Sequence, residues 1–292
     1  QDEGSARLIT ELGLTSLMTF TERYVHTGNV ALNVAEFDSP SADAPVMVLV
    51  HGYGSNWNTW GRVVDKLAAE FHVFAVDLRA MGRSGSYGKG SSRQTWADDI
   101  AAVIPKLSDE PVYLIGHSLG GWVTAAVAAA HPELISKAIL VEPYSGANSE
   151  VRKEARKRPA EERGLRAQQI RDARTPEDLI PAVTEQYAGA SEDSIKRIAV
   201  MWFQMDPALE EGPVSSREDE ETFDDMFSSI KCPTLMINGA SDKGGILSEE
   251  ESERVAGLIP DIRVLTWPKV GHSPHIARNH DFIRATKRFW AE

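Results

Sequence analysis

A serine lies in the centre of a glycine-rich turn, Gly-His-Ser-Leu-Gly, at residues 116–120. The apolar residues 112–115 before it predict a buried strand, and the small apolar residues 122–130 after it predict a helix. Gly-x-Ser-x-Gly between a strand and a helix is typical of a nucleophile elbow. The serine there takes a strained backbone conformation, so the residues two positions away on either side must be small. The pattern predicts that Ser118 is a nucleophile at the N-terminus of a helix.

The composition is that of a soluble globular protein of one or two domains, with 292 residues of which 42% are hydrophobic and 25% charged. A formal net charge of -12 argues against nucleic acid or an anionic membrane as a partner. Cys232 is the single cysteine, so no internal disulfide can form, and we interpret it as a small core residue.

No apolar run approaches the length of a membrane-spanning helix, and residues 1–20 lack a charged leader followed by an apolar core. We therefore expect a cytoplasmic protein. Because the chain begins at Gln1 rather than Met, the sequence is also compatible with a leader that was removed.

Strand and helix patterns alternate along most of the chain, which predicts a mostly parallel sheet with helices on both faces. A helix is expected over residues 6–20, followed by an edge hairpin at 23–26 and 30–37. Continuous apolar runs predict strands that are buried on both faces. The expected strands are 45–50, 73–77, 112–115, 138–141, 234–238 and 263–267, and the expected helices are 57–70, 95–107, 122–130, 248–259 and 280–290.

The alternation stops between residues 145 and 229, where charged helical patterns are interrupted by prolines. We interpret this segment as a helical insert, with residues 1–144 and 230–292 forming the main domain. Loops after parallel strands lie at the carboxyl edge of a sheet, and Ser118 also emerges there. The insert is therefore expected to form a cap over the serine.

With these motifs in this order, the chain resembles the α/β-hydrolase-fold serine hydrolases of the capped type, over about residues 21 to 292. In that family the nucleophile, the acid and the histidine follow one another along the chain, each on a loop after a strand. The resemblance assigns these roles to Ser118, Asp242 and His272. A neutral serine hydroxyl is a poor nucleophile, so His272 would take its proton and Asp242 would orient the imidazole.

The resemblance also implies an oxyanion hole made by the backbone N–H groups of Tyr53 and Leu119. Glu142, at the end of the strand after the elbow helix, is an alternative acid, because some family members carry the acid at that position. His51 and His117 are interpreted as loop-shaping residues. His275 lies near His272, but the motif has no further ligand to complete a metal site, so neither a metal nor a cofactor is predicted.

The primary hypothesis is a serine hydrolase that cleaves a carboxylic ester or lactone through an acyl-enzyme on Ser118. Apolar residues near the strand ends and in the insert predict a moderately sized, partly apolar small-molecule substrate. Two alternatives are a carbon-carbon bond hydrolase or perhydrolase with the same triad, and a non-catalytic ligand receptor on a hydrolase scaffold. The candidate substrate-binding residues are Trp57, Trp122, Met201, Trp202 and Phe203.

Overall fold

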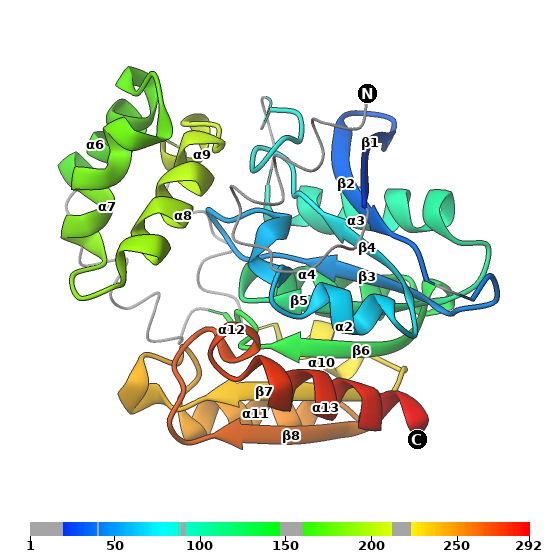
Figure 1. Ribbon diagram of the computed structural model, residues 1–292. Coiled ribbons are helices and arrows are strands. Elements are labelled where there is room, and N and C mark those ends of the chain that lie inside the picture. The colour runs from blue at the N-terminus through cyan, green and yellow to red at the C-terminus, as the bar shows by residue number, and fades with distance from the viewer. Residues whose placement is uncertain (1–19, 40, 87, 89–91, 147–159, 212–222) are drawn as a thin grey trace.

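One eight-stranded sheet forms the centre of the protein, with strand order β1-β2-β4-β3-β5-β6-β7-β8 (Figure 1). The computed structural model describes residues 20–39, 41–86, 88, 92–146, 160–211 and 223–292, so the helix expected over residues 6–20 lies almost wholly outside the described residues. Strands β1 and β2, and β2 and β4, pair antiparallel, and the other neighbours pair parallel. The strands are β1 (Thr21–His26), β2 (Ala31–Phe37), β3 (Val46–Val50), β4 (His72–Val76), β5 (Val112–His117), β6 (Ile135–Val141), β7 (Thr234–Gly239) and β8 (Ile262–Trp267).

The strands in the middle of the sheet are buried on both faces, which confirms the α/β fold expected from the continuous apolar runs. In β3, Val48 and Val50 face one hydrophobic cluster, whereas Met47 and Leu49 face the other. Side chains alternate between the two faces of a strand, so an apolar residue at every position buries both faces.

Helices cover each of these faces. Ile100 of α3 and Val123 of α4 belong to one cluster, and Leu67 of α2 and Phe282 of α13 belong to the other. The serine cap expected at residue 248 is present, since Ser248 Oγ accepts a hydrogen bond from the Glu251 backbone N–H at 3.1 Å. The helices of the main domain are η1 (Trp57–Trp60), α2 (Val64–Ala68), α3 (Arg93–Leu107), α4 (Leu119–Ala130), η2 (Pro132–Leu134), α10 (Asp224–Ser228), η5 (Ser241–Lys243), α11 (Glu249–Leu258), α12 (Pro274–Ala277) and α13 (Asn279–Ala291).

The helices between residues 160 and 211 form a separate group at the edge of the sheet toward which the β3, β6 and β8 arrowheads point (Figure 1). Several of their apolar side chains make a small cluster of their own, around Val183, Ile195 and Trp202. Ile170 and Leu209 pack instead into or against the cluster beside α4. Phe227 of α10 also packs into that cluster, although α10 falls within the expected insert. The helices of the group are α6 (Ala160–Asp172), η3 (Pro176–Leu179), α7 (Ile180–Gln186), α8 (Glu192–Phe203) and α9 (Ala208–Glu211).

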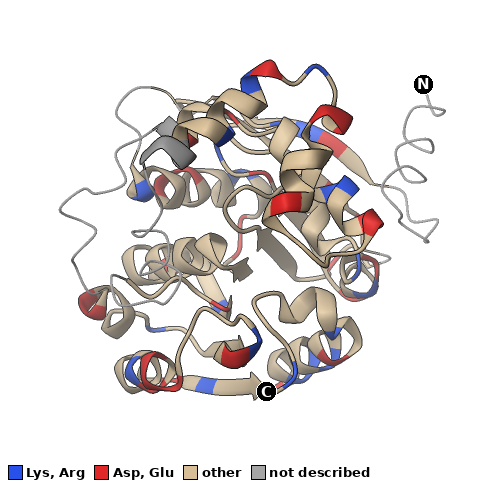
Figure 2. Cartoon of the chain, turned by 90° about the vertical axis from the view of Figure 1, so that its left-hand side faces the viewer, with Lys and Arg blue, Asp and Glu red and all other residues tan. Residues whose placement is uncertain are grey.

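Charged residues of both signs lie mainly on the outer helices and loops, as the view onto this side shows (Figure 2). No helix among the described residues is both long enough and apolar enough to cross a membrane. The candidate site residues are located at the ends of the parallel strands, and their arrangement depends on how closely β5 and α4 pack.

We expect Gly116→Ala to destabilise the protein by about 3 kcal/mol or more. An added Cβ would lie 1.9 Å from the Gly120 carbonyl oxygen and 2.4 Å from Thr124 Oγ1, so the strand-turn-helix unit would have to move. The free energy of unfolding in urea, followed by circular dichroism, measures this loss.

Gly257→Ala in α11 is the matched control, because nothing lies within 4 Å of a Cβ added there. The glycine is exposed within a helix, so this change should stabilise the protein by about 0.5–1 kcal/mol. Equal stability of the two variants would contradict the close packing of β5 and α4.

Candidate active site

Ser118 occupies a sharp turn between β5 and α4, with φ 55° and ψ -113°. A side-chain-bearing residue at positive φ costs on the order of 1–3 kcal/mol, so the surrounding structure must hold it. Its N–H donates to the Val141 carbonyl at 2.9 Å, and its own carbonyl accepts from the N–H groups of Trp122 and Tyr144 at 3.1 and 3.2 Å. The backbone of the serine is thus fixed between the start of α4 and the end of β6.

The glycines around the serine are required by close backbone contacts. A Cβ on Gly120 would lie 2.3 Å from the Val50 carbonyl oxygen, just as one on Gly116 would meet the helix. Gly52, two residues past the end of β3, is less tightly enclosed, since a Cβ there would be 3.2 Å from Ser118 Cβ. The loop after β3 therefore lies directly against the serine.

His272 pairs with a buried carboxylate. Its Nδ1 lies 3.3 Å from Glu142 Oε2, on the loop that follows β6. The Glu142 carboxylate is fully buried and also accepts the backbone N–H groups of Gly239 at 2.7 Å and Ile246 at 2.6 Å. Because an ionised carboxylate only accepts hydrogen bonds, this pattern assigns the imidazole proton to Nδ1 and leaves Nε2 able to take a proton.

Asp242, the acid expected from the sequence, lies elsewhere on the loop after β7. Its side chain is 71% exposed, and its carboxylate pairs with Lys243 Nζ at 3.1 Å. Within the described part of the chain, no ion pair of 4.0 Å or less joins it to His272. Of the two acids that the sequence offered, the structure brings Glu142 to the histidine.

His117 connects the loop of the serine to the loop of the histidine. Its Nε2 donates to the His272 carbonyl oxygen at 2.7 Å, and the two rings lie 4.6 Å apart between centroids. Because His117 immediately precedes Ser118, this bond joins two loops that are 155 residues apart in the sequence. Burial, together with the nearby His275 and His272 rings, holds the pKa of His117 well below its usual value.

Two further histidines are buried and neutral near the site. His51 Nδ1 donates to the Gly52 carbonyl at 2.7 Å, and its Nε2 accepts the Leu78 N–H at 3.0 Å. Burial lowers the pKa of His51 to about 4. His275 packs against Trp60 with ring centroids 4.5 Å apart, and burial lowers its pKa to about 3. His51 therefore shapes the loop that carries Tyr53, as the sequence indicated.

Tyr53, expected to contribute a backbone N–H, also contacts the outer group of helices. Its hydroxyl donates to the Leu209 carbonyl at 3.2 Å and to Glu210 Oε1 at 2.9 Å. Glu210 also pairs with Arg166 of α6. The loop after β3 thus reaches the residues of α9.

Two neighbouring side chains extend this contact. Ser55 Oγ lies 3.6 Å from Met201 Sδ, and Asn56 Nδ2 donates to Gln204 Oε1 at 2.8 Å. Both partners lie at the C-terminal end of α8. The outer helices are therefore joined by side chains to the loop that lies beside Ser118.

The two tryptophans expected in a pocket on the main domain occupy enclosed positions. Trp57 is 2% exposed, its ring packs against Phe20 and Phe37, and its Nε1 donates to Glu22 Oε1 at 2.9 Å. Trp122 is 4% exposed and packs within the cluster that includes α4. These contacts are those of core residues.

The three candidates on α8 have different surroundings. Trp202 is 3% exposed within the cluster of the outer helices, and the Arg166 guanidinium lies 5.0 Å above its ring. Phe203 is 37% exposed. Met201 is half-buried and contacts Ser55, so it is the candidate that the structure brings to the loop after β3.

Sequence reasoning gave His117 only a loop-shaping role and ranked Glu142 second as the acid. The available signal for Glu142 was a carboxylate that directly follows a strand buried on both faces and precedes a proline.

Among the residues that the structure describes, one group of three side chains could hold a metal ion. It consists of Glu36, Asp38 and His72, at β2 and β4.

Comparison with known proteins gives matches over most of the chain. The family described as "Alpha/beta hydrolase family" matches residues 47–285. A putative carbamate hydrolase RutD of Rhizobium rhizogenes is 28% identical over 85% of this chain and 93% of that protein. A pimeloyl-[acyl-carrier protein] methyl ester esterase of Aeromonas hydrophila is 26% identical over 84% of this chain and 95% of that protein. The crystal structure of the enol-lactonase from Burkholderia xenovorans LB400 shares the fold, with a TM-score of 0.73 at 20% identity, covering 92% of this chain and 100% of that chain.

Acidification should destabilise the protein through its buried histidines. His51, His117 and His275 have pKa values below the ordinary 6.5, so the unfolded chain binds more protons than the folded chain. Their contribution to stability is present above pH 6.5 and is lost as the pH falls toward 4. Burial raises the pKa of Asp77 to about 6, which opposes this trend with a single group. The urea midpoint should therefore be lower at about pH 5 than at about pH 7.5.

His275→Phe should reduce this pH dependence, because the substitution removes one buried titrating ring and keeps an aromatic side chain beside Trp60. Each pKa unit corresponds to about 1.4 kcal/mol, so the change is measurable. His131→Gln, at a ring that is 43% exposed, is the control and should leave the pH dependence as it is in the unmodified protein. If the urea midpoint depends on pH identically in the unmodified protein, His275→Phe and His131→Gln, then burial of His275 does not contribute to the loss of stability in acid.

Proposed function

This chain belongs to the alpha/beta hydrolase family, and we propose on that basis that it cleaves a carboxylic ester or lactone through an acyl-enzyme on Ser118. The observation that carries the proposal is the pairing of His272 with the buried Glu142, on loops held beside a serine at positive φ. A nucleophile, a base and an orienting carboxylate are the groups that acyl transfer needs.

In this mechanism, Ser118 Oγ attacks the acyl carbon while His272 Nε2 takes the hydroxyl proton. The imidazolium is stabilised by the Glu142 carboxylate at Nδ1, and it then protonates the leaving alkoxide. A water molecule, deprotonated by the same Nε2, cleaves the acyl-enzyme and restores the serine. His117 serves as a positioning residue, because its bond to the His272 carbonyl fixes the loop of the base.

The carbonyl oxygen becomes negatively charged in the transition state and needs fixed donors. We assign these to the backbone N–H groups of Tyr53 and Leu119. A Cβ added to Gly52 would lie 3.2 Å from Ser118 Cβ, and this nearness of the chain before Tyr53 to the serine supports the assignment. Removing one such donor typically raises the activation free energy by about 3 kcal/mol.

We assign the acid role to Glu142 rather than to Asp242. A carboxylate that orients a base must be fixed, and Glu142 is held by two backbone N–H groups besides the ring. It is fully buried, so its interaction with an imidazolium is weakly screened. Asp242 is largely exposed, and water would screen it from a charged ring.

Helices α6–α9 are proposed to act as a cap. They lie at the carboxyl edge of the sheet and contact the loop that carries Tyr53. A cap at this place excludes water from the acyl-enzyme and restricts the size of the substrate. The names of the relatives, a methyl ester esterase and an enol-lactonase, support an ester or lactone as the substrate class.

A panel of nitrophenyl esters and lactones tests the proposed function. The unmodified protein should hydrolyse members of the panel with a burst of alcohol release, and a serine-directed phosphonate should label Ser118. Ser118→Ala should abolish labelling and lower kcat by about 10⁶. A single equivalent of product without turnover would indicate a receptor, and labelling that persists in Ser118→Ala would place the nucleophile elsewhere.

Glu142→Gln should lower kcat by about 10³ to 10⁴, because the imidazole would lose both its orientation and its counter-charge. Asp242→Asn should leave kcat within about twofold, since its side chain is exposed at a distance from the ring. Steady-state kinetics on one reactive ester ranks the two variants.

The amide of Glu142→Gln would face backbone N–H donors, so its fold must be checked by circular dichroism and by phosphonate labelling of Ser118. A folded variant with slow labelling supports Glu142 as the acid. A larger loss in Asp242→Asn than in Glu142→Gln would return the role to Asp242.

Tyr53→Phe should raise KM for a bulky ester by about tenfold while changing kcat for an acetate ester little. The substitution removes the hydroxyl bonds to Leu209 and Glu210 and keeps the backbone N–H of residue 53. Tyr187→Phe, the same change at an exposed position among the outer helices, is the control. Equal effects on the small and the large ester would argue against a cap that governs substrate size.

A further inference from the structure

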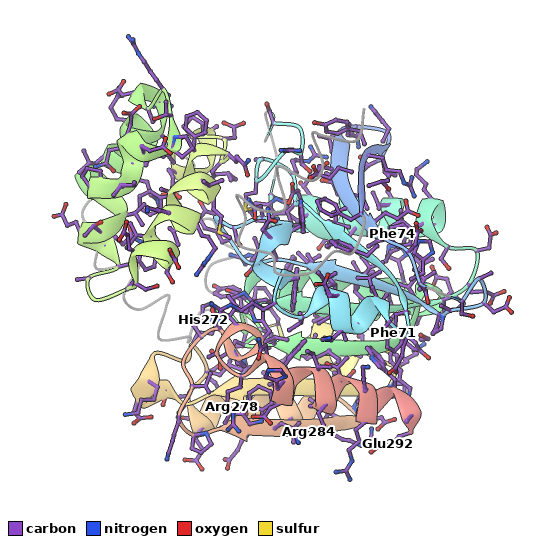
Figure 3. The ribbon with its side chains drawn as sticks, viewed as in Figure 1. Phe71, Phe74, His272, Arg278, Arg284 and Glu292 are labelled. Carbon is purple, nitrogen blue, oxygen red and sulfur yellow. The ribbon has the colours of Figure 1, made fainter. Side chains whose placement is uncertain are left out.

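A groove separates the last helix, α13, from the edge strand β8, away from Ser118. Its volume is about 540 Å³, within the range of pockets that hold small organic molecules. β8 pairs with β7 on one side, so it forms the edge of the sheet. Figure 3 shows Arg278, Arg284 and Glu292 spaced along α13, with Arg278 nearest the end of the molecule that carries His272.

The floor of the groove is apolar because α13 covers β7 more fully than β8. In the sheet, Leu265 pairs with Ile237 and Trp267 pairs with Gly239, so these residues face the helix side. Ile237 is fully buried, whereas Leu265 on the neighbouring strand is 37% exposed. The groove thus has open apolar surface beside the buried Phe289.

Arginines form the rim at the end near Arg278. Both Arg278 and Arg284 pair with Asp281, so one carboxylate is shared between two guanidinium groups. The Arg278 guanidinium also lies 5.7 Å above the Trp267 ring. Each guanidinium has five N–H donors, and a shared carboxylate cannot occupy them all.

The opposite end repeats this arrangement. Arg263 and Arg288 share Glu292, at 3.0 and 3.6 Å, and the Arg263 guanidinium lies 5.5 Å above the Phe289 ring. Each end therefore carries two positive charges and one negative charge. An excess of positive charge around this groove contrasts with the formal net charge of -12 for the whole chain.

We propose that this groove binds an amphipathic carboxylate, such as a free medium-chain fatty acid. The alkyl chain would lie along Leu265 and Trp267, and the carboxylate would accept hydrogen bonds from the rim arginines. An apolar floor beneath an arginine rim matches a molecule with one apolar and one anionic part. A second copy of the chain is disfavoured, because a twofold contact would bring the same excess of arginines together. This proposal does not depend on the reaction at Ser118.

Isothermal titration of sodium decanoate, below its micelle concentration, into the full chain tests the proposal. Arg284→Glu with Arg288→Glu reverses two charges that are 76% and 84% exposed, so the fold should be kept. This double variant should bind decanoate about tenfold more weakly or worse. Arg62→Glu with Lys66→Glu, at the same spacing beside and within α2, is the matched control and should bind as the unmodified protein does.

A second variant, Leu265→Gln, tests the apolar floor and should also weaken binding. Decanol and decyltrimethylammonium should bind more weakly than decanoate, because they lack the negative charge. The proposal is overturned if decanoate fails to bind, if both double variants bind it equally, or if decyltrimethylammonium binds as well. It is likewise overturned if the protein binds phosphatidylglycerol vesicles but not free decanoate. The same holds if Arg284→Glu with Arg288→Glu converts a dimer into a monomer and leaves the affinity for decanoate unchanged.

Discussion

Backbone packs directly on backbone where α4 begins. A Cβ on Gly120 would lie 2.3 Å from the Val50 carbonyl oxygen, and one on Gly116 would lie 1.9 Å from that of Gly120. These contacts bring the first turn of α4 closer to the ends of β3 and β5 than side chains would allow. Ser118 at φ 55° and the loop that carries Tyr53 both take their positions from this approach. The strain at the serine is held by the many hydrogen bonds and contacts of the surrounding sheet.

Several polar side chains around His272 are buried, among them one carboxylate and two imidazole rings. The Glu142 carboxylate is fully buried, yet it accepts two backbone N–H groups, which replace the water it has lost. Burial lowers the pKa of His117 and of His275, although the bond from His117 Nε2 to the His272 carbonyl opposes this effect at His117. Neutral rings beside His272 limit the repulsion that an imidazolium there would meet.

The outer helices and the groove at β8 extend the main domain in different ways. α8 and α9 reach the loop after β3 through polar side chains, among them Gln204 with Asn56, and the nearby Met205 and Leu209 also pack into or against the apolar cluster beside α4. The groove at β8 instead follows from the geometry of the sheet, since one helix cannot cover both β7 and the edge strand.

The sequence by itself determined the architecture and the place of Ser118 at a tight turn between a strand and a helix. Continuous apolar runs at β3, β5 and β7 specify strands buried on both faces, and the glycines at 116 and 120 specify a tight turn. These features are local, so they can be recognised without the fold. Only the tertiary structure shows that Glu142 rather than Asp242 pairs with His272, because both carboxylates follow strands that end at the same edge. The choice depends on N–H groups from Gly239 and Ile246, about a hundred residues from Glu142 in the sequence. The tryptophans show the same limit, because the sequence does not distinguish an apolar side chain that lines a pocket from one that fills a core. Trp57 and Trp202 are both buried among apolar side chains.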